Sequence, residues 1–128
     1  MSIQIIRILI AGALFVHGVG HTLGYFMPAR SWLFPNRSAR AMRVIANILW
    51  TLAAVGFILS FLSFLGILRP PELWRTLAVV FAIVSLVGLA LFWGMWPRFN
   101  TIGALTMNIV ILITQLWIAW PPIEMFGY

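Results

Sequence analysis

Hydrophobic residues dominate the chain in four long runs, and none of these runs contains a charged side chain. The uncharged windows cover residues 8–29, 44–68, 76–97 and 99–123, and each is 22 to 25 residues long. A helix needs about 20 apolar residues to cross the hydrocarbon core of a bilayer. The pattern therefore predicts an all-α fold, a polytopic membrane protein built as a bundle of four transmembrane helices.

Prolines set the expected ends of these helices, because proline disfavours helical backbone in the residue before it. A proline follows each apolar run within a few residues. Asn36 or Ser38 is placed to cap the second helix. We expect one membrane domain over residues 1–128, with spans at 5–27, 41–68, 73–96 and 101–120.

The positions of tryptophan agree with these ends. Tryptophan is enriched where a transmembrane helix meets the membrane–water interface. Six of the seven tryptophans lie at or within a turn of an expected helix end: Trp32, Trp74, Trp93, Trp96, Trp117 and Trp120. This agreement is independent of the hydropathy pattern and supports the same order of spans.

Composition narrows the class of protein further. The chain is 63% hydrophobic and 8% charged, with a mean hydropathy of +1.07. Almost nothing remains for a water-soluble core, which excludes a soluble enzyme, a nucleic-acid-binding domain and a secreted disulfide scaffold. The absence of cysteine excludes thiolate metal sites and iron–sulfur clusters. The formal charge of +6 comes from arginines that flank the apolar windows, so we expect membrane lipids and not nucleic acid as partners.

The arginines also predict an orientation. Four of them surround an aromatic segment in the first loop, where we expect contacts with lipid headgroups: Arg30, Arg37, Arg40 and Arg43. The first and third loops together carry five arginines, against three on the other side. The positive-inside rule then places loops 28–41 and 97–100 in the cytoplasm and both termini outside, in a bacterial or archaeal cytoplasmic membrane.

Polar side chains are costly inside a bilayer, so they indicate where function is to be sought. His17 and His21 are four residues apart, which puts both on one face of the first helix, about 6 Å apart along its axis. Estimates of depth from the helical rise place Thr51 and Asn108 near the same level, with Asn47 closer to the surface. We therefore predict a polar cluster of His17, His21, Thr51 and Asn108 as a candidate cofactor site.

Several interpretations of this cluster remain open. The simplest is a pair of uncharged imidazoles that bond to Asn108, Thr51 or a backbone carbonyl. A quinone headgroup needs only one or two hydrogen-bond partners beside an apolar slot, so quinone binding is a second hypothesis. Two histidines on one helix face cannot ligate both sides of one haem iron, although either could ligate a haem shared with another subunit. No metal site is expected, because such a site needs three or four ligands.

Glycines beside the histidines indicate a helix interface. Gly20 and Gly24 form a GxxxG pair, which lets another backbone approach closely. We expect a small integral subunit that packs through its first helix against partner membrane chains. The alternatives are a redox protein using the histidines and a small carrier or lipid-handling homo-oligomer. The sequence assigns no catalytic residue, and both acids, Glu72 and Glu124, lie in expected loop or tail, so we do not expect catalysis by this chain alone.

The first helix also carries a pattern of spaced glycines and phenylalanine after an arginine. The residues of this pattern are Arg7, Gly12, Phe15, Gly18, His21 and Gly24. It resembles the DoxX-like small membrane proteins, in which a basic residue, usually lysine, stands near the position of His21. The resemblance implies a four-helix bundle and, in some cases, an accessory subunit of a quinone-linked oxidoreductase.

Overall fold

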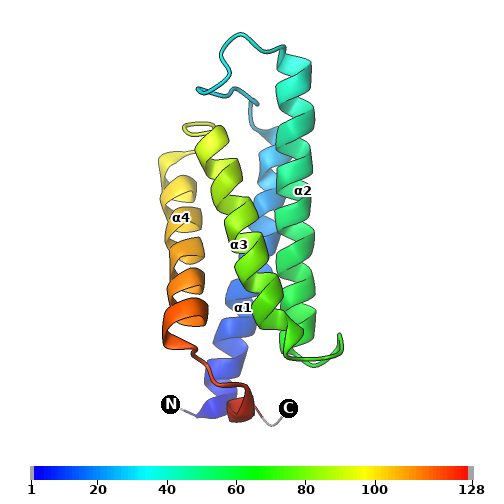
Figure 1. Cartoon of the computed structure of the whole chain (residues 1–128), viewed down its shortest axis with the longest axis vertical. Helices are drawn as coiled ribbons and strands as arrows, with labels where there is room; N and C mark the ends of the chain where they lie inside the picture. The colour runs from blue at the N-terminus through cyan, green and yellow to red at the C-terminus, as the bar shows by residue number, and fades with distance from the viewer. Residues whose placement is uncertain (1, 127–128) are drawn as a thin grey trace.

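A computed structural model describes residues 2–126 as a set of helices joined by short loops (Figure 1). Residues 1 and 127–128 of the expected domain lie outside the described residues. The elements in chain order are α1 (Ile3–His21), η1 (Thr22–Phe26), α2 (Ala39–Phe64), α3 (Leu73–Leu91), α4 (Arg98–Leu112), η2 (Ile113–Ile118) and η3 (Ile123–Phe126).

Within residues 2–126, four helical segments are long and apolar enough to cross a membrane. They are Ile3–Phe26, Ala39–Phe64, Leu73–Leu91 and Arg98–Ile118. The expectation of an all-helical fold with four such helices is confirmed. At most 39% of the most apolar stretch of any segment is buried inside the protein, so the outer surface of the bundle is itself apolar. Such a surface is accommodated by lipid tails and indicates a membrane location.

The first half of the chain follows the expected boundaries closely. α1 continues through the short 3-10 helix η1 to Phe26. Ser38, and not Asn36, caps α2, because its side-chain oxygen accepts the Ala41 N–H at 3.2 Å. α2 ends at Phe64 instead of 68, and Gly66 follows it with a positive φ of 75° that glycine adopts without strain.

The second half shows larger differences. α3 ends at Leu91 instead of 96, because the chain already turns at Phe92 and Gly94 takes a φ of 82°. α4 then begins at Arg98 instead of 101, directly after Pro97. Its last turns widen into the π-helix η2, which ends at Ala119 in a left-handed conformation. The turn expected at 97–100 is therefore wrong, since residues 98–100 form the first turn of α4.

α2 lies at the centre of the bundle and packs against both α1 and α3, while α4 packs mainly against α3 (Figure 1). Direct packing between α1 and α4 is sparse. The apolar core forms two clusters, one that includes Phe57 and one that includes Trp50. The polar residues described next lie between these clusters, beside the seam between α1 and α4.

Glycines allow the close approach of α1 and α2. A Cβ atom on Gly18 would lie 3.1 Å from the Cβ of Phe57, and one on Gly24 would overlap the indole ring of Trp50. Gly24 therefore packs inside this chain and is not available to a partner helix. Gly20, the other member of the expected GxxxG pair, has nothing within 4 Å of its Cβ position.

Candidate ligand-binding site

A chain of hydrogen bonds joins three helices inside the bundle. His17 Nε2 on α1 lies 2.9 Å from Asn108 Oδ1 on α4. Asn108 Nδ2 donates to Ser85 Oγ on α3 at 2.7 Å. Ser85 Oγ lies in turn 3.1 Å from His21 Nε2 on α1. Asn108 and Ser85 are fully buried, and His21 is only 3% exposed, so these polar groups depend on one another for hydrogen bonds.

The Asn108 amide gives a consistent assignment of donors and acceptors along this chain. Its carbonyl oxygen accepts, so His17 Nε2 carries a hydrogen and donates. Its amide nitrogen donates to Ser85, whose own hydroxyl then donates to His21 Nε2. The proton of an uncharged His21 ring then resides on Nδ1. Nδ1 makes no hydrogen bond with any residue from 2 to 126, so it remains a free donor.

The structure brings together three of the four expected cluster residues, His17, His21 and Asn108. Thr51 lies elsewhere: it is exposed, lies 2.5 Å from the Tyr25 hydroxyl and donates to the Asn47 carbonyl oxygen at 2.7 Å. Its expected place in the cluster is therefore wrong. Ser85 takes that place, a residue that the estimate of depth did not bring into the cluster.

Aromatic rings hold the His21 side chain. Its ring stacks on Trp50, with centroids 5.7 Å apart and an angle of 10° between the planes. It also stacks on Phe57 at 5.8 Å and 11°. Trp96 meets it edge-on at 6.5 Å. With Ser85 bound to Nε2 and rings around it, His21 has little freedom to change rotamer.

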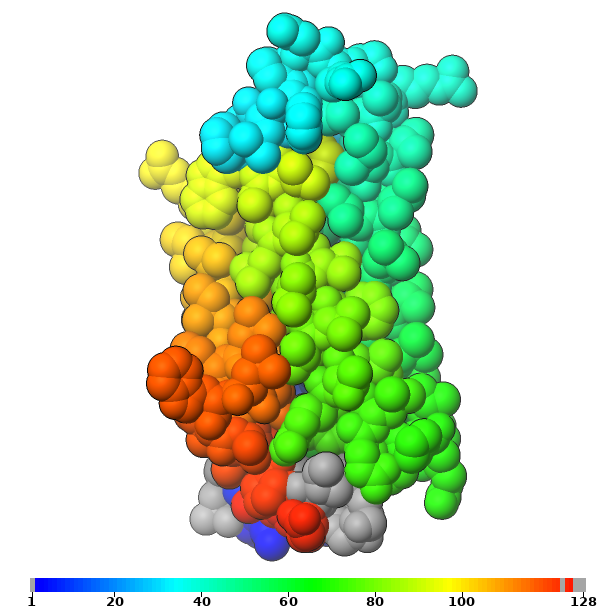
Figure 2. Space-filling view, viewed as in Figure 1, coloured from blue at the N-terminus to red at the C-terminus, as the bar shows by residue number. Residues whose placement is uncertain are grey.

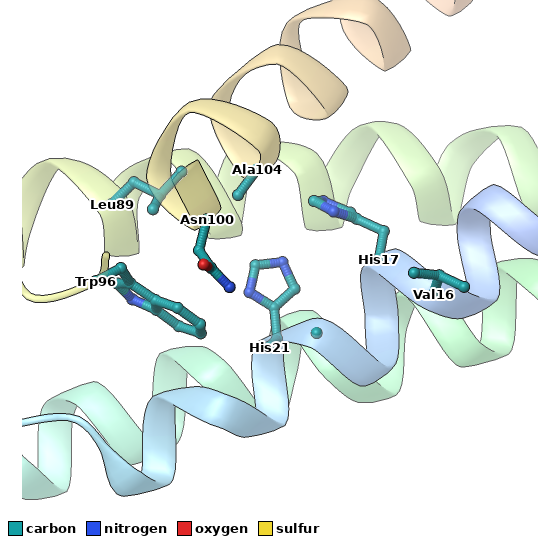
Figure 3. Close-up of a pocket in the computed structure, with 8 residues that line it drawn as sticks. Val16, His17, His21, Leu89, Trp96, Asn100 and Ala104 are labelled. Atoms are coloured by element: carbon teal, nitrogen blue, oxygen red, sulfur yellow. The ribbon is translucent and has the colours of Figure 1, made fainter. Parts of the chain in front are cut away.

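A cavity of about 150 Å³ lies beside the histidines, between α1 and α4. Its lining residues are Val16, His17, Gly20, His21, Leu89, Trp96, Asn100 and Ala104. Figure 3 shows the His21 ring and the Asn100 side chain pointing toward one another from opposite walls. Val16 is 68% exposed, so the cavity reaches the outer surface of the bundle. Asn100, which the sequence suggested only as a turn residue, is thus a second polar group at this site.

Trp96 contributes its ring, and not its N–H, to the cavity. Its side chain lines the cavity and is 9% exposed. The indole Nε1 is buried and has no acceptor among residues 2–126. A buried donor without an acceptor costs about 1–3 kcal/mol, and this atom, which has almost no accessible surface, does not reach a ligand in the open cavity.

Neither a haem nor a metal ion suits these residues. Nε2 of both histidines is already engaged inside the bundle, and the cavity has room for one small ring and not for a macrocycle. No group of three or more His, Cys, Asp or Glu side chains that could hold a metal occurs in the described part of the chain. The donors present suit an uncharged ligand that carries acceptor oxygens.

The four arginines expected at lipid headgroups have different roles in the structure. Arg43 donates to the carbonyl oxygens of Met27 at 2.6 Å and Tyr25 at 3.2 Å. It therefore ties the end of η1 to α2. The other three, Arg30, Arg37 and Arg40, are exposed at the same end of the bundle.

Comparison with known proteins identifies no relative. No protein-family model, no curated protein and no solved structure matches this chain. The resemblance of its first helix to the DoxX-like proteins remains a prediction.

Proposed function

We propose that this protein binds a lipid-soluble ligand with a ring-sized headgroup and acceptor oxygens, of the quinone class, in the cavity between α1 and α4. The observation that carries the proposal is the placement of His21 and Asn100 on facing walls of a cavity that reaches the surface of the bundle. An integral membrane protein meets such ligands in the bilayer itself, so a lateral entrance is the expected route.

The size of the cavity supports a single ring. An apolar cavity of about 150 Å³ accommodates one benzene molecule, and this cavity has the same volume, about 150 Å³. A quinone ring therefore fits, while its isoprenoid tail must lie outside. A second cavity of about 250 Å³, lined mostly by apolar side chains, lies further along the α1–α4 seam, beyond the His17–Asn108 bond. This seam offers the tail an apolar path.

The hydrogen-bonding groups support a carbonyl-bearing headgroup. His21 Nδ1–H and the Asn100 amide are two donors at one small cavity. A quinone presents two carbonyl oxygens and needs no charged partner. A site built to hydrogen-bond such oxygens discriminates strongly against an apolar analogue, because its donors would then stay unpaired.

Replacing Asn100 with alanine is expected to weaken quinone binding about tenfold, the effect of losing about 1.4 kcal/mol from one buried hydrogen bond. Asn100 is partly exposed in the first turn of α4, so the fold should tolerate the change. The measurement is quenching of tryptophan fluorescence by a short-chain ubiquinone analogue, in protein purified in a mild detergent.

Thr51→Val provides the matched control, since it removes a polar group at a similar depth that does not line the cavity. Binding by this variant should stay within twofold of the wild type. Equal binding by Asn100→Ala and the wild type would exclude the cavity as the headgroup site. Equal weakening by both variants would show that binding depends on the fold as a whole and not on the Asn100 side chain.

A second candidate function, a subunit that associates through α1, is supported by the outer face of that helix. Gly12 and Gly20 have nothing within 4 Å of their Cβ positions, and Val16 between them is 68% exposed. We expect Gly12→Leu to abolish association with a partner chain or a second copy, because a bulky side chain blocks close backbone approach. Native mass spectrometry after mild extraction measures this. A monomeric wild-type protein would contradict the subunit function and leave ligand binding unaffected.

The orientation follows the charges. The loop between η1 and α2, together with the first turns of α2 and α4, carries five arginines and no acid, whereas Glu72 and Glu124 belong to the opposite end of the bundle. The first of these ends is proposed to face the cytoplasm.

A further inference from the structure

The loop between η1 and α2 lines a third cavity, of about 400 Å³, at one end of the bundle. Figure 2 shows this loop in cyan, covering that end of the molecule. Two arginines line the cavity, Arg30 and Arg37, and both are exposed. The remaining lining residues are Ala29, Ser31, Phe34, Pro35, Ala39 and Met42.

This loop is held in place by the end of α3. Ser31 Oγ donates to the Leu91 carbonyl oxygen at 2.7 Å, and Trp32 Nε1 donates to the Ala90 carbonyl oxygen at 2.6 Å. Ala29 and Ser31 are buried on either side of Arg30. The backbone that carries Arg30 is therefore anchored to the bundle, which lowers the cost of ordering this arginine around a ligand.

Nothing in the described part of the chain neutralises these two charges. The acids of the chain, Glu72 and Glu124, belong to the other end of the bundle (Figure 1). Arg43, by contrast, is engaged with backbone carbonyls, and Arg40 does not line the cavity. Two arginines that line one cavity without a carboxylate favour an anion there.

We propose that the cavity between Arg30 and Arg37 binds the phosphate group of an anionic phospholipid. Guanidinium groups donate in a planar fork that matches phosphate oxygens. The exposed aromatic side chains of Trp32 and Phe34 lie in the same loop, where they suit the boundary between headgroups and acyl chains. The source of the phosphate is therefore a membrane lipid and not a soluble ion. This site is independent of the quinone site proposed above.

The test compares lipid binding by native mass spectrometry of the full chain in a neutral detergent. Phosphatidylglycerol is expected to bind with a defined stoichiometry and more tightly than phosphatidylcholine. Arg30→Gln and Arg37→Gln, made separately, should each weaken phosphatidylglycerol binding about tenfold. Thermal unfolding of each variant without lipid confirms that the fold is retained.

Arg40→Gln is the matched control, because it removes the same charge from the same end of the bundle without lining the cavity. It should change binding less than twofold. Equal weakening by Arg40→Gln would show diffuse attraction and overturn the site. Equal binding of phosphatidylcholine, or displacement of the lipid by inorganic phosphate at the same concentration, would overturn the proposed ligand.

Discussion

Replacing Gly24 with alanine is expected to lower the free energy of unfolding by about 2–3 kcal/mol, within the range for overpacking a full core. The added Cβ would overlap the indole ring of Trp50, which is fully buried. Trp50 cannot move away on the other side, because Gly88 also approaches it so closely that a Cβ there would lie 2.8 Å from the ring. The two glycines thus form the space that the indole fills.

The consequence reaches the ligand site, because Trp50 stacks on His21. We expect Gly24→Ala to weaken quinone binding as well as stability, measured by fluorescence quenching and by unfolding in mixed micelles of increasing SDS content. Gly12→Ala is the control, since its Cβ meets nothing within 4 Å and alanine favours helix over glycine by about 1 kcal/mol. A Gly24→Ala protein as stable as Gly12→Ala would contradict the packing described here.

The apolar pattern was sufficient to predict the helices, for a simple physical reason. Each uncharged window must satisfy its own backbone hydrogen bonds in lipid, and a helix does so within one segment. The errors lie at the ends, where one residue can decide the outcome. Gly94 with its positive φ ends α3 near Leu91 instead of at 96, and no hydropathy pattern reports backbone conformation.

The candidate site was predicted only in part, because hydropathy gives depth and not rotation. His17 and His21 share a face by their spacing, and the estimate of depth brought Asn108 to them. The same estimate brought in Thr51, but its neighbour Trp50 is the residue that faces inward. Adjacent helical residues point about 100° apart, so only one of the two can face His21.

Ser85 and Asn100 were missed for different reasons. Ser85 stands in a row of small residues on α3, and small residues commonly serve helix packing. Its hydroxyl becomes significant only when Asn108 and His21 are known to flank it. Asn100 was placed in the expected loop at 97–100, yet it lies in the first turn of α4. In both cases the decisive contact comes from a distant part of the chain.

Asn108→Leu is expected to have the largest effect of the single substitutions considered, a loss of about 3 kcal/mol in the free energy of unfolding. Leucine has the same number of side-chain heavy atoms in the same branched arrangement, so it leaves no large cavity, but it offers no hydrogen bond. His17 Nε2 loses its acceptor and Ser85 loses its donor. Each buried group left without a partner costs about 1–3 kcal/mol in proteins generally. Hydrogen bonds between membrane helices average about 0.6 kcal/mol, with a maximum near 1.7. The expected loss of about 3 kcal/mol therefore corresponds to two such bonds near the upper end of the range.

The effect should be specific to this position on α4. Thr106→Leu makes the same kind of change two residues away, where the side chain is exposed on the outside of the bundle, and should cost nothing measurable in detergent. Unfolding in SDS, followed by tryptophan fluorescence and circular dichroism, compares the two variants. Equal stability of the two proteins would show that the Asn108 amide contributes no net stability.

A double-mutant cycle with Ser85→Ala separates the hydrogen-bond chain from simple packing. If Asn108 acts through Ser85, Ser85→Ala should clearly lower the free energy of unfolding of the wild-type protein. The same substitution should lower it little further in the Asn108→Leu protein. Strict additivity would mean that the two side chains stabilise the bundle independently. The same cycle, measured on quinone binding, tests whether this chain positions His21, because both substitutions then weaken binding through the one bond from Ser85 to His21 Nε2.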